Sequence, residues 1–333
     1  MMKFRNRSFS LCVALVLTAL LATGMPGCNR KSKGEQGRGE TKLVLPNEVK
    51  NITVQQLLPK ATKRTGRGEK DVAQKVLEDY SYGTLAGQYG RLNVAVKHLL
   101  KALKADPIFT DAHHNLGLAY YRMGKVEQAI SEWRRTLELD PTYAETYYNL
   151  GVFLADNNRA DDSVKLFEEA IRFDTLHLKA RYALGKTAQD KGQYQEAIRH
   201  YKTFQQKDRG NLKVHLALGE TYLLAGMLES SQREYEAAAR VDDKNPMIHY
   251  QLGVAYHRSN RITEAIQQYK RATELAPDMI DGYVNLGDLH TFRKDYAKAL
   301  RAYNAALGVD SRNAYARKKS AEMEKRLLAN QKQ

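Results

Sequence analysis

The sequence has almost no cysteine: among its 333 residues only Cys12 and Cys28 carry a thiol. Both lie within the first 28 residues, which leaves no thiol in the rest of the chain. A disulfide framework and a cysteine-based metal site are therefore excluded. The composition is otherwise that of a folded chain, with 43% apolar and 27% charged residues.

Long hydrophobic runs are also missing. The most apolar stretch, LCVALVLTALL at residues 11–21, is shorter than the roughly 20 residues that a membrane-spanning helix needs. Lys3, Arg5 and Arg7 precede it, and this order of basic and apolar segments is typical of an export signal. We therefore expect residues 1–27 to be a signal peptide.

The end of this segment, MPGC at residues 25–28, resembles the box of a bacterial lipoprotein signal. In such signals the cysteine is diacylated and becomes the first residue of the mature chain, so the resemblance implies lipidation of Cys28. Met25 and Pro26 depart from the usual box, and ordinary signal cleavage or an uncleaved anchor are the alternatives. Asn29 stands where an aspartate retains some lipoproteins in the inner membrane, which favours the periplasmic face of the outer membrane.

An excess of one charge sign is missing from the body of the chain. The formal net charge is +15, but residues 71–310 carry 32 basic and 32 acidic side chains, so the excess lies at the two ends. Because the chain has an export signal and no basic patch interleaved with aromatic residues, we expect no nucleic-acid partner. The basic ends are either solvated or in contact with anionic lipid.

Residues 28–75 are expected to form the lipidated cysteine and a basic, flexible tether. The stretch at 29–42 is rich in Gly, Lys and Arg, a less polar stretch follows at 43–59, and KATKRTGRGEK covers residues 60–70. About 40 residues of extended chain reach on the order of 130 Å. Such a tether would hold the body of the protein away from a bilayer.

A 34-residue period runs through the rest of the chain. One glycine marks each of seven copies: Gly83, Gly117, Gly151, Gly185, Gly219, Gly253 and Gly287. A small residue follows twelve positions later: Ala95, Ala129, Ser163, Ala197, Ser231, Ala265 and Ala299. A large residue follows four positions after that: Leu99, Trp133, Phe167, Tyr201, Tyr235, Tyr269 and Tyr303.

Glycine inside an apolar helical face costs roughly 1 kcal/mol against alanine, so its recurrence needs a packing reason. We expect each glycine to face the small residue of a second helix, and the large residue to fill the space against the following unit. The turns between helices carry glycine or asparagine, with Lys294 as the exception. Thr142, followed three residues later by Glu145, matches a helix-capping box.

These residues resemble the tetratricopeptide repeat: Leu-Gly, often a Tyr, the small residue, the aromatic residue and an optional closing proline. The resemblance implies an all-α fold, a right-handed α-solenoid of about seven helical hairpins. A final capping helix and basic tail are expected at residues 314–333, with Tyr315, Met323 and Leu327 packed on the last repeat. The seven repeats are expected at residues 76–109, 110–143, 144–177, 178–211, 212–245, 246–279 and 280–313.

No motif in the repeats predicts catalysis, a metal site or a cofactor. LGKT at residues 184–187 resembles the end of a phosphate-binding loop, but Ala180 occupies the position of the required glycine. The histidines lack the spacing of metal ligands. Since no serine, histidine and aspartate pattern or carboxylate pair has a local signature, we expect a protein that is not an enzyme.

The resemblance implies that the first helices of the repeats line a concave groove for a peptide or protein. Tyrosine rings supply contact area there, and amide side chains pair with a peptide backbone. The alternative is that the tyrosines pack neighbouring first helices. A carboxylate clamp like that of some cochaperones is excluded, because its positions hold His114, Leu118 and Ala183. The predicted groove residues are Tyr80, His114, Asn115, Tyr148, Asn149, Lys179, Tyr182, Tyr250 and Asn285.

We therefore expect a non-enzymatic scaffold, tethered to a membrane of the bacterial cell envelope, that binds a protein or peptide partner in its groove. It would assist the assembly or localisation of an envelope complex, by analogy with tetratricopeptide lipoproteins that pilot secretins or support type IV pili. The alternative is an accessory subunit that recruits an envelope polysaccharide or peptidoglycan enzyme. The sequence predicts neither the identity of the partner nor the oligomeric state.

Overall fold

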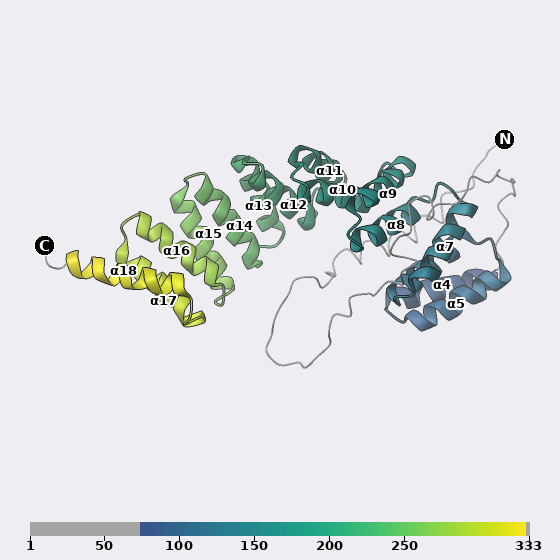
Figure 1. The fold of residues 1–333 in the computed structure, drawn as a ribbon, viewed down its shortest axis with the longest axis horizontal. Coiled ribbons are helices and arrows are strands. Elements are labelled where there is room, and N and C mark those ends of the chain that lie inside the picture. Colours follow the sequence, from purple (N-terminus) through teal and green to yellow (C-terminus); the bar gives the residue numbers. More distant parts are fainter. Residues whose placement is uncertain (1–73, 331–333) are drawn as a thin grey trace, which may run out of the picture. The chain divides into compact units, whose positions relative to one another are not determined.

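The computed structural model describes residues 74–330, and within this range the chain forms fifteen α-helices and no strand (Figure 1). The predicted signal peptide, Cys28 and almost all of the tether lie outside the described residues. In the described range every helix is too short or too polar to cross a bilayer. The helices are α4 (Gln74–Gln88), α5 (Leu92–Ala105), α6 (Thr110–Arg122), α7 (Val126–Leu139), α8 (Ala144–Asp156), α9 (Ala160–Phe173), α10 (Leu178–Asp190), α11 (Tyr194–Lys207), α12 (Leu212–Leu224), α13 (Leu228–Val241), α14 (Pro246–Arg258), α15 (Ile262–Leu275), α16 (Ile280–Phe292), α17 (Tyr296–Val309) and α18 (Ala314–Asn330).

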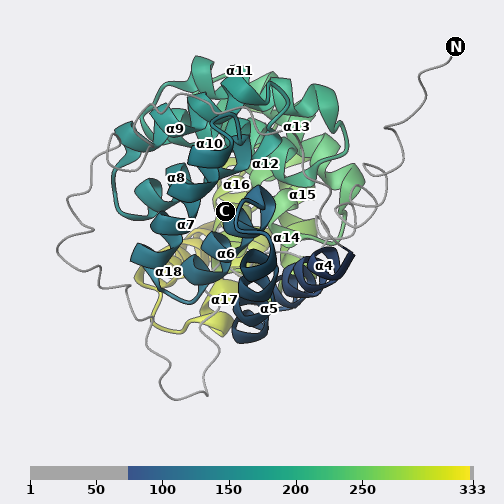
Figure 2. The ribbon, with the colours of Figure 1, turned by 90° about the vertical axis from the view of Figure 1, so that its right-hand side faces the viewer.

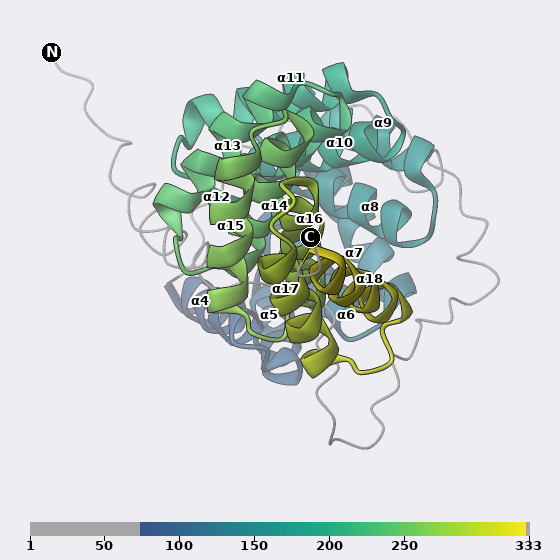
Figure 3. The ribbon, with the colours of Figure 1, turned by 90° about the vertical axis from the view of Figure 1, so that its left-hand side faces the viewer.

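The first fourteen of these helices form seven hairpins, from α4 with α5 to α16 with α17. Each helix packs most extensively on its hairpin partner, and each second helix also packs on the first helix of the next hairpin. Figure 2 is viewed with α4 and α5 in front, and Figure 3 with α17 and α18 in front. The prediction of an all-α solenoid with about seven helical hairpins and a final helix is confirmed.

The repeated glycines make room for an aromatic ring of the same hairpin. A Cβ atom added to Gly117 would lie 2.6 Å from Trp133, and one added to Gly151 would lie 2.6 Å from Phe167. In the four later repeats, a Cβ atom added to the repeated glycine would lie 2.5 to 2.9 Å from the nearest atom of a tyrosine ring. These distances are shorter than any ordinary carbon contact, so only glycine fits beneath the ring.

This contact corrects the expected partner of the glycines. We expected the small residue to face the glycine and the large residue to pack against the following unit. Instead, the large residue covers the glycine of its own hairpin, and the small residue contributes its backbone, as with the carbonyl oxygen of Ala129, 3.1 Å from the Cβ position of Gly117. Gly83 is the variant case, because a Cβ there would meet Leu99 and the Ala95 carbonyl at 3.0 to 3.2 Å.

All seven turns inside the hairpins contain one residue with a left-handed backbone. Lys294 differs from the other turn residues in type, but its φ of 62° gives it the same left-handed backbone. A lysine in this region costs roughly 1–2 kcal/mol relative to a right-handed backbone, so packing of the hairpin overrides the local preference. The other six residues are Gly90, Gly124, Asn158, Gly192, Gly226 and Asn260.

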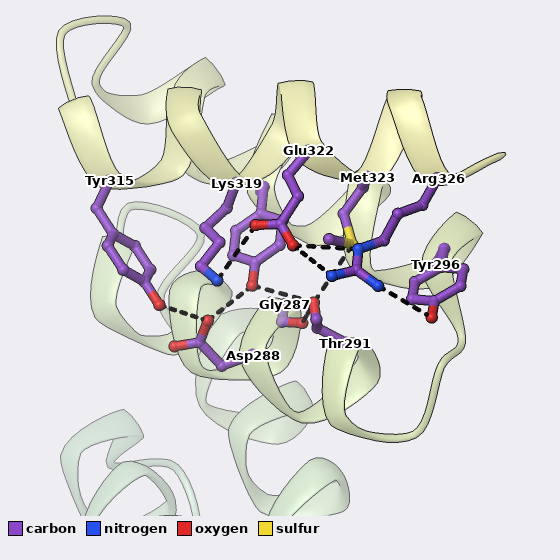
Figure 4. A network of polar contacts seen from close by, with 10 residues as sticks. Gly287, Asp288, Thr291, Tyr296, Tyr315, Lys319, Glu322, Met323 and Arg326 are labelled. Carbon is purple, nitrogen blue, oxygen red and sulfur yellow. Dashed lines mark hydrogen bonds and ion pairs between the residues drawn. The ribbon is translucent and has the colours of Figure 1, made fainter. Parts of the chain in front are cut away.

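The final helix, α18, covers the last hairpin. Met323 is fully buried, and the hydroxyl of Thr291 donates to its sulfur at 3.4 Å (Figure 4). Tyr315 remains 47% exposed, but its hydroxyl donates to Oδ1 of Asp288 at 2.8 Å. The hydroxyl of Tyr303 donates to the same Asp288 oxygen at 2.7 Å. The last hairpin is thus closed by a mixed apolar and polar contact.

The ring-over-glycine contact predicts the effect of one added methyl group. Gly151→Ala should destabilise the protein by about 1–3 kcal/mol, because the Phe167 ring must shift. Gly308→Ala is the matched control: Gly308 lies in α17 with nothing within 4 Å of its Cβ position, and alanine there should stabilise by up to about 1 kcal/mol. Urea unfolding followed by circular dichroism measures both. Equal stability of the two variants would contradict the packing role.

Candidate functional site

The predicted groove residues all lie on first helices of the hairpins, in α4, α6, α8, α10, α14 and α16. We call this surface the first-helix face. The side chains at the fifth and sixth positions of consecutive repeats reach each other across 35 residues of sequence. The face is therefore a set of contacts between neighbouring hairpins as well as a surface.

Three amides cross from one first helix to the one before it. Nδ2 of Asn115 donates to the hydroxyl oxygen of Tyr80 at 3.1 Å, and Nδ2 of Asn285 donates to that of Tyr250 at 3.3 Å. Nδ2 of Asn149 lies 3.4 Å from Nε2 of His114. These contacts favour the packing alternative for Tyr80 and Tyr250. All of these residues except His114 are half-buried and keep part of their surface exposed to solvent. Their contact with a partner therefore stays a prediction.

His114 needs a corrected role, because it is only 5% exposed. Its Nδ1 lies 2.7 Å from Oγ1 of Thr146 on the next first helix. Burial lowers the pKa of His114 to about 4, so the ring is neutral near pH 7. His114 therefore packs beneath the first-helix face, between two neighbouring first helices, and exposes little surface to a partner.

Glu145 links the third and fourth repeats. The backbone N–H of Ala180 donates to Nδ1 of His177 at 3.1 Å, so Nε2 of that ring carries the proton and donates to Glu145 at 2.7 Å. Nζ of Lys179 donates to the other carboxylate oxygen at 2.6 Å. Burial would raise the pKa of Glu145, but His177 and Lys179 outweigh it and lower that pKa to about 2.

The expected capping box of Thr142 and Glu145 is therefore wrong. The N-cap residue of α8 is Tyr143, with no side-chain capping bond. The hydroxyl of Thr142 donates instead to Asp140 at 2.7 Å. Glu145 instead accepts hydrogen bonds from His177, at the end of its own repeat, and from Lys179 of the following repeat, neither of which a local capping motif contains.

The series of amide contacts is interrupted in the middle of the chain, where Ala183 and Ala217 occupy the sixth position. Within residues 74–330, no hydrogen bond reaches the hydroxyls of Tyr148 and Tyr182. Their rings rest on the core aromatic residues of their own hairpins, at 5.7 Å from Phe167 and 5.4 Å from Tyr201, measured between ring centroids. Burial raises the pKa of Tyr148 to about 12, so its hydroxyl is a proton donor at neutral pH.

Lys213, which the sequence prediction missed, completes this part of the surface. Its Nζ lies 4.0 Å from the ring centroid of Tyr182, and in the described part of the chain it has no carboxylate partner. Burial lowers the pKa of Lys213. The available signal was the period itself, because Lys213 follows Lys179 by 34 residues, and Lys179 lies 5.9 Å from the Tyr148 ring.

Tyr148, Lys179, Tyr182 and Lys213 together form a tyrosine–lysine patch. It offers two hydroxyls without a bound partner and one ammonium group whose charge is not neutralised. Hydroxyls pair with peptide backbone groups and an ammonium group pairs with a carboxylate, while the rings supply apolar area. The patch is suited to binding an extended peptide that carries an acidic group.

Three other histidines connect the two helices of a single hairpin. Each of three first-helix histidines bonds to the second helix 19 residues later and to a carbonyl oxygen six residues earlier. Between residues 74 and 330, no three His, Cys, Asp or Glu side chains are placed to hold a metal ion. The three pairs are His113 with Glu132 (2.6 Å), His215 with Glu234 (2.7 Å) and His249 with Gln268 (2.8 Å).

Sequence models of the repeat match more than half of the chain. The model described as "TPR repeat" matches residues 88–124, 119–158 and 255–291. Models described as "Tetratricopeptide repeat" match residues 144–173, 188–252 and 280–313. The chain therefore belongs to the tetratricopeptide repeat family, whose fold serves as a scaffold for binding proteins and peptides. No curated protein sequence matches the chain.

Solved structures of tetratricopeptide proteins share the fold. The C-terminal part of a repeat protein from Cytophaga hutchinsonii aligns with a TM-score of 0.62 at 16% identity, over 72% of this chain and 98% of that one. PilW, described as a widely conserved type IV pilus biogenesis factor, aligns with a TM-score of 0.52 at 18% identity, over 61% of this chain and 94% of PilW. YrrB, described as a repeat protein with an unusual peptide-binding site, aligns with a TM-score of 0.51 at 19% identity, over 55% of this chain and 95% of YrrB. Identities this low establish the fold alone.

The buried His114 predicts a pH dependence of stability. Its folded pKa lies below the ordinary value of 6.5, so the unfolded chain binds more protons and stability falls as the pH drops from 6.5 toward 4. Between pH 7 and 4.5 this one group should cost about 2 kcal/mol of unfolding free energy. The variant His114→Gln should lose about that much less than the native chain over the same range. Urea unfolding at both pH values measures the difference, and equal losses would contradict a buried neutral ring.

Proposed function

We propose that this protein is a membrane-tethered scaffold of the bacterial cell envelope that binds an acidic, extended segment of a partner and helps to assemble or localise an envelope complex. The tyrosine–lysine patch is the observation that carries this proposal. Elsewhere on the first-helix face, asparagine side chains already contact the polar atoms of a tyrosine or histidine in the preceding repeat. At Tyr148, Tyr182 and Lys213 the polar groups are available to another molecule.

Charge decides which class of partner segment the patch favours. Lys179 is neutralised by Glu145 at 2.6 Å, whereas Lys213 is held over the Tyr182 ring without a counter-ion in the described residues. A partly buried ammonium group gains most from a carboxylate that replaces its lost hydration. An aspartate, a glutamate or a chain terminus of the partner would supply it.

The envelope location rests on the N-terminal sequence. A basic start, a short apolar run and MPGC ending in Cys28 support export followed by lipidation. The fold similarity to a type IV pilus biogenesis factor is consistent with this setting and names no partner for this chain. We propose no catalytic role and no cofactor, because the tetratricopeptide fold typically acts by binding.

Lipidation is tested by the intact mass of the mature protein. A chain that begins at Cys28 and carries a diacylglyceryl group should be found in the membrane fraction, because two acyl chains give stable anchoring. Cys28→Ala should lack the lipid mass and leave that fraction. A native chain that is cleaved elsewhere, or that is uncleaved and without lipid, would overturn the lipoprotein part of the proposal.

Partner binding is tested by photo-cross-linking in intact cells, with Tyr182 replaced by p-benzoylphenylalanine. We expect a cross-linked envelope protein whose yield falls at least about tenfold when Lys213→Ala is added, since a lost charged pair costs about 1.5–3 kcal/mol. Lys202→Ala is the matched control, because Lys202 also lies over a tyrosine ring, Tyr222, at 5.9 Å. Its yield should not change.

The identity of the cross-linked protein distinguishes the two functional hypotheses, an assembly scaffold and a recruiting subunit of an enzyme system. Pilus or secretin components support the assembly role. Polysaccharide or peptidoglycan synthases or hydrolases support the alternative of a recruiting subunit. If Lys213→Ala and Lys202→Ala give the same yield, the tyrosine–lysine patch is not the binding site.

A further inference from the structure

The first hairpin leaves a face of α4 open that every later first helix buries. The third, seventh and tenth residues of a repeat lie on one side of the helix. This side is turned toward the preceding hairpin, since a Cβ added to Gly282, the third residue of its repeat, would meet Thr273 of α15 at 2.7 Å. At the seventh position, six leucines are at most 8% exposed: Leu116, Leu150, Leu184, Leu218, Leu252 and Leu286.

The same positions of α4 hold Glu78, Tyr82 and Leu85. Tyr82 packs with one side on His98 of α5, at 4.5 Å between ring centroids, yet remains 52% exposed. Leu85 is 47% exposed, and Tyr89, one turn further, is 76% exposed. A shallow depression on this part of α4 is lined by Leu77, Glu78, Ser81, Tyr82 and Leu85. An apolar face of this kind marks the site of a missing contact.

The sequence one period before α5 does not predict an ordinary second helix that would cover this face in register. Such a helix would occupy residues 58–71, one period before α5. That stretch contains Pro59, Gly66 and Gly68, and Thr65 stands where the later repeats carry an aromatic residue. It lacks both the helix-forming sequence and the large core side chain.

The stretch just before it has the apolar side chains that the face needs. Residues 43–58, LVLPNEVKNITVQQLL, hold eight aliphatic residues, whereas residues 29–42 hold none. The 15 residues from 59 to 73 span up to about 50 Å when extended. Helix α4, with 15 residues, is about 22 Å long. The connection is therefore long enough to bring residues 43–58 to any point on α4.

We propose that residues 43–58 dock on the open face of α4 and cover Tyr82 and Leu85. A short linker gives the segment an effective concentration in the millimolar range, which favours it over a second copy of the chain. From the exposed fractions, the face offers roughly 400 Å² at most, about half of what one partner buries in a stable complex. Intramolecular docking tolerates so small an area.

Docking would change the length of the tether. With residues 43–58 fixed on α4, only residues 29–42 remain between Cys28 and the folded body. Their reach is about 50 Å, compared with about 150 Å for the whole stretch to residue 73. The solenoid would then be held close to the surface that anchors Cys28.

Photo-cross-linking of the purified full chain tests this contact. Leu85 is replaced by p-benzoylphenylalanine, and a mixture of ¹⁵N-labelled and unlabelled protein is irradiated and digested. We expect cross-links from position 85 to residues 43–58 of the same copy. The same substitution at Leu328, which is 60% exposed on α18, is the control and should not reach that segment. Cross-links to another copy, or none to residues 43–58, would overturn the proposal.

A second measurement does not depend on the cross-linker. The double variant Ile52→Asp, Leu57→Asp should raise the amide hydrogen-exchange rates of α4 at least about tenfold, because the face loses its cover. Thr62→Asp, Thr65→Asp places the same charges in the connecting stretch and should leave these rates unchanged. Unchanged exchange in both variants would also overturn the docking. Neither result depends on lipidation or on a bound partner, so each can fail separately from the proposed function.

Discussion

The contact between an aromatic ring and a glycine, made once in each of six hairpins, determines how the rest of the structure is arranged. The ring occupies the space where a Cβ atom would lie, at 2.5 to 2.9 Å, and so fixes how closely the two helices approach. Its other side supports the first-helix face, where Tyr148 rests on Phe167 and Tyr182 rests on Tyr201. The candidate binding surface is therefore built directly on the core, and a change beneath the ring should be felt at the surface.

Because each hairpin is covered by its neighbours, the two ends of the described chain need separate solutions. At the C-terminal end, α18 buries Met323 and places Tyr315 on Asp288, so the last hairpin is closed by residues of its own chain. At the N-terminal end, α4 keeps Tyr82 and Leu85 half exposed. The difference between the two ends is the physical reason to expect a further covering segment at the first hairpin.

The period in the sequence predicted the hairpins because helix formation and burial recur every 34 residues. It could not predict contacts that depend on which side chains meet across two repeats. Glu145 matched a local capping box, but it bonds instead to His177 and Lys179, which lie more than 30 residues further along the chain. Lysine is not a residue type expected in a left-handed turn, yet the hairpin imposes that conformation on Lys294. For the candidate site, the period located the tyrosines. It could not predict that the ammonium group of Lys213 has no counter-ion in the described residues, because that depends on which side chains lie around it.

Specific binding in a repeat protein requires that some repeats differ from the others. A surface in which every asparagine bonded to the tyrosine before it would be stable and would have few polar groups left for a partner. Here Ala183 and Ala217 stand at the positions where other repeats carry asparagine, and the contacts are interrupted. The hydroxyls of Tyr148 and Tyr182 then lose their neighbours while their rings keep the support of the core. The same alanines that weaken the link between repeats thus leave polar groups on a surface held by the core, where a partner peptide would be bound at a small ordering cost.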